Sequence, residues 1–232
     1  MIIRSDNITK AFGTHEVLKG LSFNASQGEV LSIVGASGAG KTTLLQILGT
    51  ILYPDSGSVI IDGVDVFSLD AKALSAFRNQ KIGFVFQFHH LLPEFTAVEN
   101  IMLPALIGRY EGASSQRLTD SQIRKHAEEL LRELGLKGKE GSRPSELSGG
   151  EQQRVAIARA MINQPKIIFA DEPSGNLDSK TSGEIIDLLK YTNERLKQTI
   201  LLITHDEKIA LSADRIITIG DGKIIRDEVM KK

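Results

Sequence analysis

A glycine-rich turn between two patterned segments is the feature that most constrains the fold of this chain. Residues 35–42 read Gly-Ala-Ser-Gly-Ala-Gly-Lys-Thr and satisfy the spacing G-x-x-x-x-G-K-[ST]. Val30–Val34, before the turn, has the composition of a short buried strand, and the chain after the turn is apolar at helical spacing. A strand, a phosphate-type loop and a helix in this order predict an α/β fold that binds a nucleotide at the loop.

The residue types of this loop suit phosphate binding. Glycines let the backbone wrap closely around phosphate oxygens with its N–H groups pointing inward, and the following helix adds its positive N-terminal end. Lys41 is the expected charge for the β- and γ-phosphates, and the Thr42 hydroxyl is the expected magnesium ligand. The alternative, a glycine-rich turn without a ligand, is disfavoured because both flanking patterns are present. The predicted ATP-binding residues here are Gly35, Ala36, Ser37, Gly38, Ala39, Gly40, Lys41, Thr42 and Thr43.

Two acids at the end of a second buried strand complete a plausible hydrolytic site. Ile167–Ala170 is a continuous apolar run that is followed directly by Asp171 and Glu172. Asp171 is expected to hold Mg²⁺, directly or through water, and Glu172 to orient or deprotonate the attacking water. Two acids that merely begin a loop are the alternative, which the phosphate loop disfavours. The chain lacks the G-x-G-x-x-G and G-x-S-x-G spacings, which argues against a dehydrogenase or a serine hydrolase.

Composition excludes several other classes. Lys and Arg total 28 against 29 Asp and Glu, so the net charge of -1 gives no support for a nucleic-acid partner bound by bulk charge. Cysteine is absent, which removes disulfides, thiolate zinc sites and cysteine nucleophiles. The N-terminus resembles no signal peptide, and apolar runs such as Ile101–Ile107 fall short of the ~18 residues typical of a membrane span. A chain that acts inside the cell is therefore expected.

Four of the five histidines show no spacing typical of metal ligands. No acid or second histidine lies at a suitable distance along the chain from any of them. Any metal is therefore expected to be Mg²⁺, held mostly by phosphate oxygens and water. His15 and His126 are interpreted as surface residues, and the other two histidines are His89 and His90.

The secondary structure expected from the sequence changes twice along the chain. Short β-like segments occupy the first sixty residues, and the middle third is more helical, with an amphipathic helix expected over Arg117–Gly135. Capping-box spacings support three helix starts in that middle region: Thr96 with Glu99, Thr119 with Gln122, and Ser148 with Glu151. In the last third, strand and helix patterns alternate, with a buried strand at Ile200–Ile203, a helix at Thr181–Leu196 and a terminal hairpin around Gly220–Gly222.

A second anion-binding motif narrows the class of nucleotide hydrolase. Leu147-Ser148-Gly149-Gly150-Glu151 precedes a helical pattern and would build another helix N-terminus suited to phosphate. At this point the chain resembles the ATP-binding subunits of ABC transporters, whose signature motif is LSGGE or LSGGQ. In that family two subunits pack head to tail, and each signature completes the ATP site of the other. The resemblance implies that Ser148, Gly149, Gly150 and Glu151 contact the ATP of a second copy of this chain.

The remaining family motifs occur in the family's order. Phe12 matches the aromatic residue that stacks on adenine, Gln87 the glutamine that contacts magnesium and the attacking water, and His205 the histidine that contacts the γ-phosphate and the catalytic glutamate. Taken singly, these three residues could be a core aromatic, a surface amide and a helix-cap histidine, but the ordered set of motifs disfavours that. The D-loop at the dimer seam matches Ser174, Gly175, Asn176, Leu177 and Asp178.

The resemblance also implies the fold. It predicts a single ABC ATPase domain over residues 1–232 in the α/β class, with a P-loop core of mixed sheet and helices, an N-terminal antiparallel β-subdomain and an inserted helical subdomain. The RecA-like core with the β-subdomain is expected at 1–87 and 161–232. The helical subdomain that carries the signature is expected at 88–160.

Residues 86–100, FQFHHLLPEFTAVEN, point to a branch of the family. This stretch closely resembles the ATPases of lipoprotein-releasing systems, the LolD type. The resemblance implies separate transmembrane permease subunits of the LolC/LolE type, a peripheral location at the cytoplasmic face of the bacterial inner membrane, and release of lipoproteins toward the outer membrane. A coupling helix of the permease is expected to dock on Phe88, His89, His90, Leu91, Leu92, Pro93 and Phe95, although packed core beneath a loop is an alternative reading.

Three other outputs remain open at the level of sequence. A macrolide-type exporter ATPase and an FtsE-type ATPase that transmits force without transport share many of these motifs. A soluble ABC ATPase of DNA repair, chromosome maintenance or translation is disfavoured, because its usual coiled-coil insertion or second cassette does not fit within 232 residues.

Overall fold

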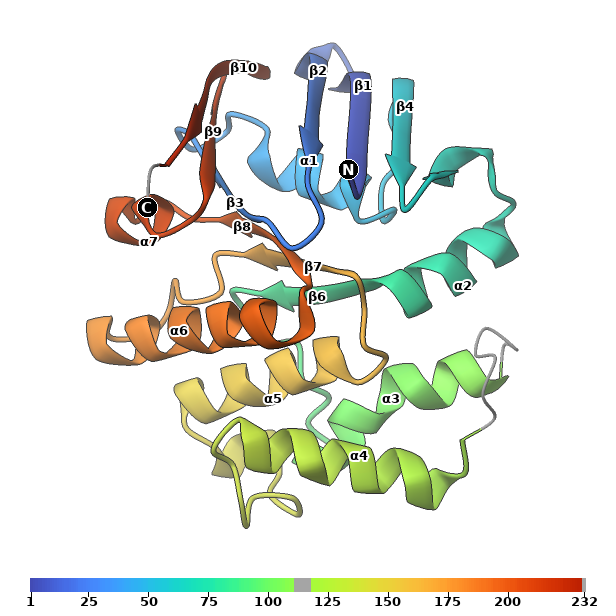
Figure 1. Cartoon of the computed structure of the whole chain (residues 1–232), viewed down its shortest axis with the longest axis vertical. Coiled ribbons are helices and arrows are strands. Elements are labelled where there is room, and N and C mark those ends of the chain that lie inside the picture. The colour runs from blue at the N-terminus through green and yellow to red at the C-terminus, as the bar shows by residue number, and fades with distance from the viewer. Residues whose placement is uncertain (111–117, 231–232) are drawn as a thin grey trace. The chain divides into compact units, whose positions relative to one another are not determined.

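A computed structural model of the chain describes residues 1–110 and 118–230 (Figure 1). These residues divide into two compact units. The first unit comprises residues 1–74, 169–172 and 192–232, and the second comprises residues 75–168 and 173–191. The helical segment predicted at 88–160 lies within the second unit.

An antiparallel sheet opens the first unit. Its order is β2-β1-β4-β5, built from β1 (Ile3–Phe12), β2 (His15–Ala25), β4 (Ser56–Ile61) and β5 (Val64–Asp65). The predicted antiparallel β-subdomain is thereby confirmed. Strand β1 extends to Phe12 because its pairing with β2 continues to the hairpin turn, where Phe12 faces His15. The apolar alternation that marks the strand in the sequence ends earlier, since Thr9 and Lys10 are polar.

The second sheet is mixed and carries the buried strands that the sequence indicates. Its order is β10-β9-β3-β8-β7-β6, and β3 (Val30–Val34) pairs in parallel with β8 (Thr199–Ile203) and β9 (Arg215–Gly220). Strand β10 (Lys223–Val229) is antiparallel to β9, which confirms the terminal hairpin. Strand β7 (Ile167–Asp171) contributes residues to both units, and β6 (Ile82–Phe86) belongs to the second. The strand ends place the acids and His205 for the site described below.

Helix α1 follows the glycine-rich turn at once. It spans Lys41–Leu48, and its apolar residues at positions 44, 45, 47 and 48 are buried, as the spacing predicts. Two further helical segments lie wholly within the first unit, the short α7 (Glu207–Leu211) and the 3₁₀ turn Val66–Ser68. Asp206 caps α7 by accepting from the N–H groups of Lys208 and Ile209, which fixes the chain immediately after His205.

The second unit is mostly helical. Thr119 and Ser148 form the predicted capping boxes with Gln122 and Glu151, and the Thr96 N–H and hydroxyl both donate to the Glu99 carboxylate. The helix predicted over Arg117–Gly135 is confirmed as α4, although Arg117 itself lies outside the described residues. The helices are α3 (Ala97–Tyr110), α4 (Asp120–Glu133), the 3₁₀ turn Pro144–Glu146, α5 (Gly149–Met161) and α6 (Ser179–Leu196), with α2 (Ala71–Lys81) and α6 shared between the units.

The sequence did not indicate two of these helices. Only Leu74 of α2 is buried, so the helix lacks the apolar stripe that marks such segments, and α7 is only five residues long. Within residues 1–110 and 118–230, we find no helix that combines the length and the apolar character needed to cross a membrane.

Candidate nucleotide-binding site

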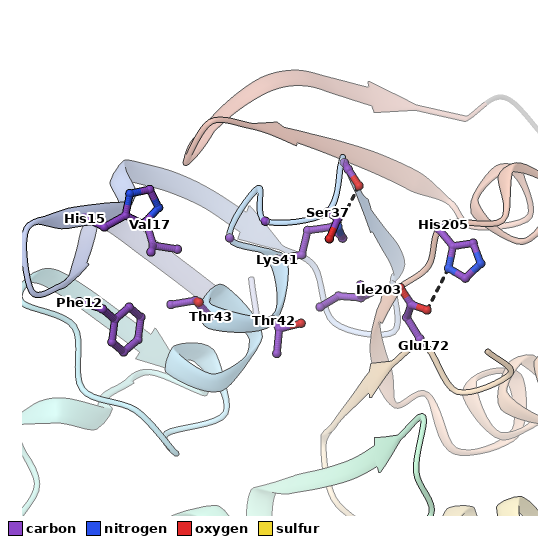
Figure 2. A pocket seen from close by; sticks show the side chains of 13 residues that line it. Phe12, His15, Val17, Ser37, Lys41, Thr42, Thr43, Glu172, Ile203 and His205 are labelled. Carbon is purple, nitrogen blue, oxygen red and sulfur yellow. Dashed lines mark hydrogen bonds and ion pairs between the residues drawn. The ribbon is translucent and has the colours of Figure 1, made fainter. Parts of the chain in front are cut away.

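A cavity of about 630 Å³ opens in the first unit, a volume within the usual range of small-molecule sites. Figure 2 shows Phe12 and His15 on one side of it, Lys41 and Thr42 between, and Glu172 with His205 on the other side. All of its lining residues belong to the first unit: Phe12, His15, Val17, Gly35, Ser37, Gly38, Gly40, Lys41, Thr42, Thr43, Glu172, Ile203 and His205.

Two glycines of the loop are required by the space around them. At Gly35 a Cβ atom would lie 2.2 Å from the carbonyl oxygen of Ile219 on strand β9. Gly40 has φ 100°, and its Cβ would lie 2.7 Å from the Leu18 side chain. Gly40 is also the N-cap residue of α1 and brings no side-chain acceptor to the first-turn N–H groups. The N-terminus of α1 is therefore built for an acceptor supplied from elsewhere, as an anion supplies it.

The ammonium group of Lys41 lies over this loop. Its Nζ donates to the carbonyl oxygens of Gly35 and Ala36, each at 2.8 Å. A positive charge is thereby held on the cavity side of the glycine-rich turn, beside the start of α1. The loop, the helix end and the lysine together present three sources of positive potential to one cavity.

Asp171 ends strand β7 and faces the same loop. Burial raises the pKa of its carboxyl group and the charge of Glu172 adds to that rise, while a hydrogen bond with Thr42 and the charge of Lys41 oppose it. A partly buried carboxylate next to a threonine hydroxyl is a pair of hard oxygen donors, the kind that Mg²⁺ prefers. Among the described residues no group of three or more His, Cys, Asp or Glu side chains is placed so that it could hold a metal ion.

Glu172 and His205 form a hydrogen-bonded pair at the far side of the cavity. His205 Nδ1 lies 2.9 Å from Glu172 Oε2, and the exposed fractions of the two side chains are 70% and 24%. The backbone of Glu172 has φ 45°, which is strained for a residue with a side chain, and its N–H donates to Ile203 O at 3.0 Å. The end of β7 is thus fixed to the end of β8, and the carboxylate is aimed at the imidazole.

The opposite side of the cavity contains one predicted residue and two that sequence reasoning missed. Phe12 is 53% exposed, and Lys10 Nζ lies 5.8 Å from its ring centroid. An aromatic ring with an open face can stack on a planar base. His15 and Val17 line the cavity beside it. His15 is exposed as predicted, but its place in the cavity could only be found from the pairing of β1 with β2.

The predicted Gln87 and the D-loop meet in the second unit. Gln87 Nε2 donates to Asn176 Oδ1 at 3.2 Å, and a Cβ on Gly175 would lie 2.9 Å from Gln87 Nε2. Asp178 accepts from the N–H groups of Lys180 and Thr181 at the start of α6. Hydrogen bonds from Thr181 lower the pKa of Asp178, which keeps this carboxylate charged at the helix end.

The signature residues form the N-terminus of α5. Ser148 Oγ accepts from the Glu151 N–H at 3.3 Å, and Glu151 Oε2 accepts from the Ser148 N–H at 2.8 Å. The Ser148 N–H bond and Lys139 lower the pKa of Glu151. A Cβ on Gly150 would lie 2.6 Å from Thr181 Cγ2. The signature helix is therefore packed closely against the start of α6, next to the D-loop.

Residues 88–95, called here the docking segment, are largely exposed. Phe88, Leu92 and Phe95 have exposed fractions of 65%, 42% and 37%, so these apolar side chains lie at the surface of the second unit as predicted. Asn100, which is fully buried in α3, accepts from the Leu92 N–H and donates to the carbonyls of Leu92, Phe95 and Thr96. The exposed segment is thus held from beneath by one buried amide.

Helix α5 fixes the other end of the docking segment. Arg159 donates to the carbonyl oxygens of His89 and His90 at 2.7 and 2.6 Å, and burial lowers the pKa of its guanidinium. Burial and the Arg159 charge lower the pKa of His89, although a hydrogen bond with Gln152 opposes this shift. Sequence reasoning missed Asn100, Arg159 and Gln152, because their partners lie far along the chain or are backbone atoms.

Comparisons with known proteins agree with this arrangement. A family model described as ABC transporter matches residues 18–175. The lipoprotein-releasing system ATP-binding protein LolD of Bacteroides fragilis is 52% identical over 97% of this chain and 100% of its own, and the LolD of Aquifex aeolicus is 45% identical over 97% and 96%. A solved dimer of the ATP-binding cassette MJ0796 in a post-hydrolysis state, bound to ADP and Pi, superposes with a TM-score of 0.89 at 40% identity, covering 99% of both chains. The similarity extends over nearly the whole chain and is not confined to the phosphate loop.

Proposed function

The chain belongs to the ATP-binding proteins of ABC transporters, and from that premise we propose that it hydrolyses ATP to drive a membrane permease that releases lipoproteins. The observation that carries this proposal is the order of groups along one cavity: an open aromatic ring, a glycine-rich loop with its lysine, and a glutamate paired with a histidine. That order matches the chemical order of ATP from base to γ-phosphate. The identity of about half of all residues with LolD proteins over nearly the full chain supports lipoprotein release as the output.

ATP binding is assigned to the Phe12 side and the loop. The adenine ring stacks on the open face of Phe12, and the phosphates lie along the N–H groups of the loop and the start of α1. Lys41 exchanges its two carbonyl acceptors for oxygens of the β- and γ-phosphates. The exchange is favourable because a phosphate is a stronger, charged acceptor than a backbone carbonyl.

Thr42 and Asp171 are the residues of the first unit that would hold magnesium. The hydrogen-bonded hydroxyl and carboxylate fit the ion, and a cation beside Asp171 would offset the cost of its partly buried charge. When bound, the ion neutralises charge on the phosphate oxygens.

Hydrolysis is assigned to Glu172 and His205. Glu172 accepts the proton of the attacking water, and His205 holds that carboxylate in place through the bond at 2.9 Å while its ring reaches toward the γ-phosphate. The strained backbone of Glu172 is consistent with a position selected for chemistry, since strain of this kind gathers at functional sites. Gln87, bonded to Asn176, is proposed as the third catalytic residue on the strength of the family resemblance.

A second copy of the chain is proposed to complete each site. The signature residues Ser148, Gly149, Gly150 and Glu151 of one copy would contact the ATP of the other, with the D-loop residues 174–178 at the seam. The helix N-terminus at α5 and its glycines support this role, because they offer N–H groups to an anion. Dimeric MJ0796 is the solved relative that makes such a pair a reasonable model.

The docking segment is proposed to receive a permease of the LolC/LolE type at the cytoplasmic face of the bacterial inner membrane. Its exposed aromatic and aliphatic side chains, held by Asn100 and Arg159, support a preformed surface for a partner helix.

The proposal can be tested by reconstitution. The chain and the permease with which it co-purifies in detergent are placed in proteoliposomes that carry a lipoprotein, and release is followed with ATP and with a non-hydrolysable analogue. ATP-dependent release that the analogue does not support is the expected result. ATP turnover in the complex without lipoprotein release would contradict the proposed output and favour export or force transmission.

A further inference from the structure

His15 shares a face of the β1–β2 hairpin with the aromatic residue of the cavity. Phe12 and His15 are directly opposed across the turn formed by Gly13 and Thr14. Opposed residues of an antiparallel pair project from the same face, with their Cβ atoms about 4.5–5.5 Å apart. Both side chains line the cavity, and Figure 2 shows them on the same side of it. An imidazole therefore stands beside the ring that is proposed to stack on the base.

The covalent order of a nucleotide places a charged group near this imidazole. If the base lies on Phe12 and the β-phosphate lies at Lys41, the ribose and the α-phosphate must occupy the cavity between them. Val17, Gly40 and Thr43 line the cavity as well, but none of these carries a charge. Among the hairpin residues that line the cavity, His15 is the one whose side chain can carry a charge beside the ribose and the α-phosphate.

Most charged side chains on the segments near His15 form ion pairs with one another. Asp221, in the β9–β10 turn, forms an ion pair with Lys19 at 2.7 Å, and this pair is the main cause of the lowered pKa of Asp221, with smaller effects from Lys223 and His15. Lys10 on β1 pairs with Asp55 at 2.6 Å. Glu16, the next residue on β2, points to the opposite face of the strand. The other charged or titratable groups that line the cavity are Lys41, Glu172 and His205.

We propose that His15 is a further nucleotide-binding residue, whose protonated imidazole contacts the ribose and α-phosphate portion of the bound nucleotide. This inference rests on the proposed function, because it takes an adenine nucleotide as the ligand, with its base on Phe12 and its β-phosphate at Lys41. Histidine is the side chain that ordinarily changes charge between pH 5 and 8, and an anion within about 4–6 Å favours its charged form. If the imidazole makes this contact, we expect nucleotide affinity to increase as the pH falls.

A second histidine in the cavity has to be separated from this effect. His205 is paired with Glu172 on the opposite side, where the γ-phosphate is proposed to lie. ADP lacks that phosphate, so an effect that originates at His15 persists with ADP, whereas one that originates at His205 depends on ATP. His205→Gln is therefore the matched control for His15→Gln, and both replacements concern exposed side chains.

The experiment measures the dissociation constant of ADP by calorimetric titration at pH 6, 7 and 8. The unaltered chain, His15→Gln and His205→Gln are compared, with circular dichroism to verify folding. Because the phosphates of ADP titrate in the same range, the ratio of the mutant to the unaltered dissociation constant is the quantity of interest. For His15→Gln we expect this ratio to be about 3 to 10 at pH 6, as one charge-assisted contact gives, and near one at pH 8. For His205→Gln the ratio should not change with pH.

Two outcomes are distinguishable failures. A ratio for His15→Gln that is the same at all three pH values would overturn the inference while leaving the proposed function intact. Absence of ADP and ATP binding by the unaltered chain would contradict the proposed function and, with it, the inference. Proton uptake on ADP binding, measured in buffers of different ionisation enthalpy, should fall in His15→Gln and persist in His205→Gln.

Discussion

Replacing Asn100 by leucine should detach the docking segment from helix α3 and lower the free energy of unfolding. The Asn100 side chain is fully buried and makes four hydrogen bonds of 2.8–3.1 Å to the backbone of the segment and of the first turn of α3. Leucine has a similar volume but no polar atom, so the replacement removes these bonds without opening a large cavity. The loss is therefore a loss of polar partners.

The size of the loss in unfolding free energy depends on which backbone groups keep a hydrogen-bond partner in Asn100→Leu. Leu92 O still accepts from the Phe95 N–H, and Thr96 O still accepts from the backbone N–H of residue 100, so the change falls chiefly on the Leu92 N–H and the Phe95 carbonyl. Each buried polar group without a partner costs about 1–3 kcal/mol. Because the segment lies at the surface and can open to water, we expect a total near the lower end, about 2 to 4 kcal/mol.

Urea denaturation measures this loss, and hydrogen exchange locates it in residues 88–96. Asn163→Leu is the matched control, since the Asn163 amide donates to the carbonyl and side chain of Asn79, away from the docking segment. The control should lose stability without faster exchange in 88–96. An unfolding free energy for Asn100→Leu within about 0.5 kcal/mol of the unaltered value, with unchanged exchange in the segment, would refute the reasoning.

Two further predictions concern the nucleotide site. Lys41→Ala should weaken ATP binding itself, because the ammonium is the proposed point charge for the phosphates, and an unchanged dissociation constant in a nucleotide titration would count against that role. Asp171→Asn should raise the melting temperature of the nucleotide-free chain at pH 7. The raised pKa means that the folded state binds this proton more tightly than the unfolded chain, so its stabilising contribution is present below the ordinary pKa of 3.8 and is lost as the pH rises through the raised value. The gain should therefore shrink toward acid pH, and a lower melting temperature at pH 7 would be the contrary result.

The parts of the fold that the sequence predicted are those with local causes. Capping boxes at Thr119 and Ser148 join residues three apart, and the loop at 35–42 can be identified from its own residue types. The ABC-type fold expected from the ordered motifs is confirmed by the likeness to MJ0796. Helix α2 escaped prediction because only Leu74 faces the core, which leaves no apolar stripe to detect.

The residues that sequence reasoning missed depend on contacts between distant segments. His15 reaches the cavity only because β1 and β2 pair up to the hairpin turn. Arg159 donates to carbonyl groups about 70 residues away along the chain. Because every residue has a backbone carbonyl, the sequence does not indicate which one accepts such a bond. For the same reason His15 was correctly expected at the surface while its place in the site was not foreseen.

The most direct test of the account is to separate ATP binding from ATP hydrolysis at Glu172. In Glu172→Gln the side chain keeps its size and can still contact His205, but it cannot accept the proton of the attacking water. ATP affinity should stay close to that of the unaltered chain, hydrolysis should fall by about 10²- to 10⁴-fold, and ATP-bound dimers should accumulate in size-exclusion chromatography. Near-normal turnover in this variant, with intact ATP binding, would contradict the assignment of the catalytic base.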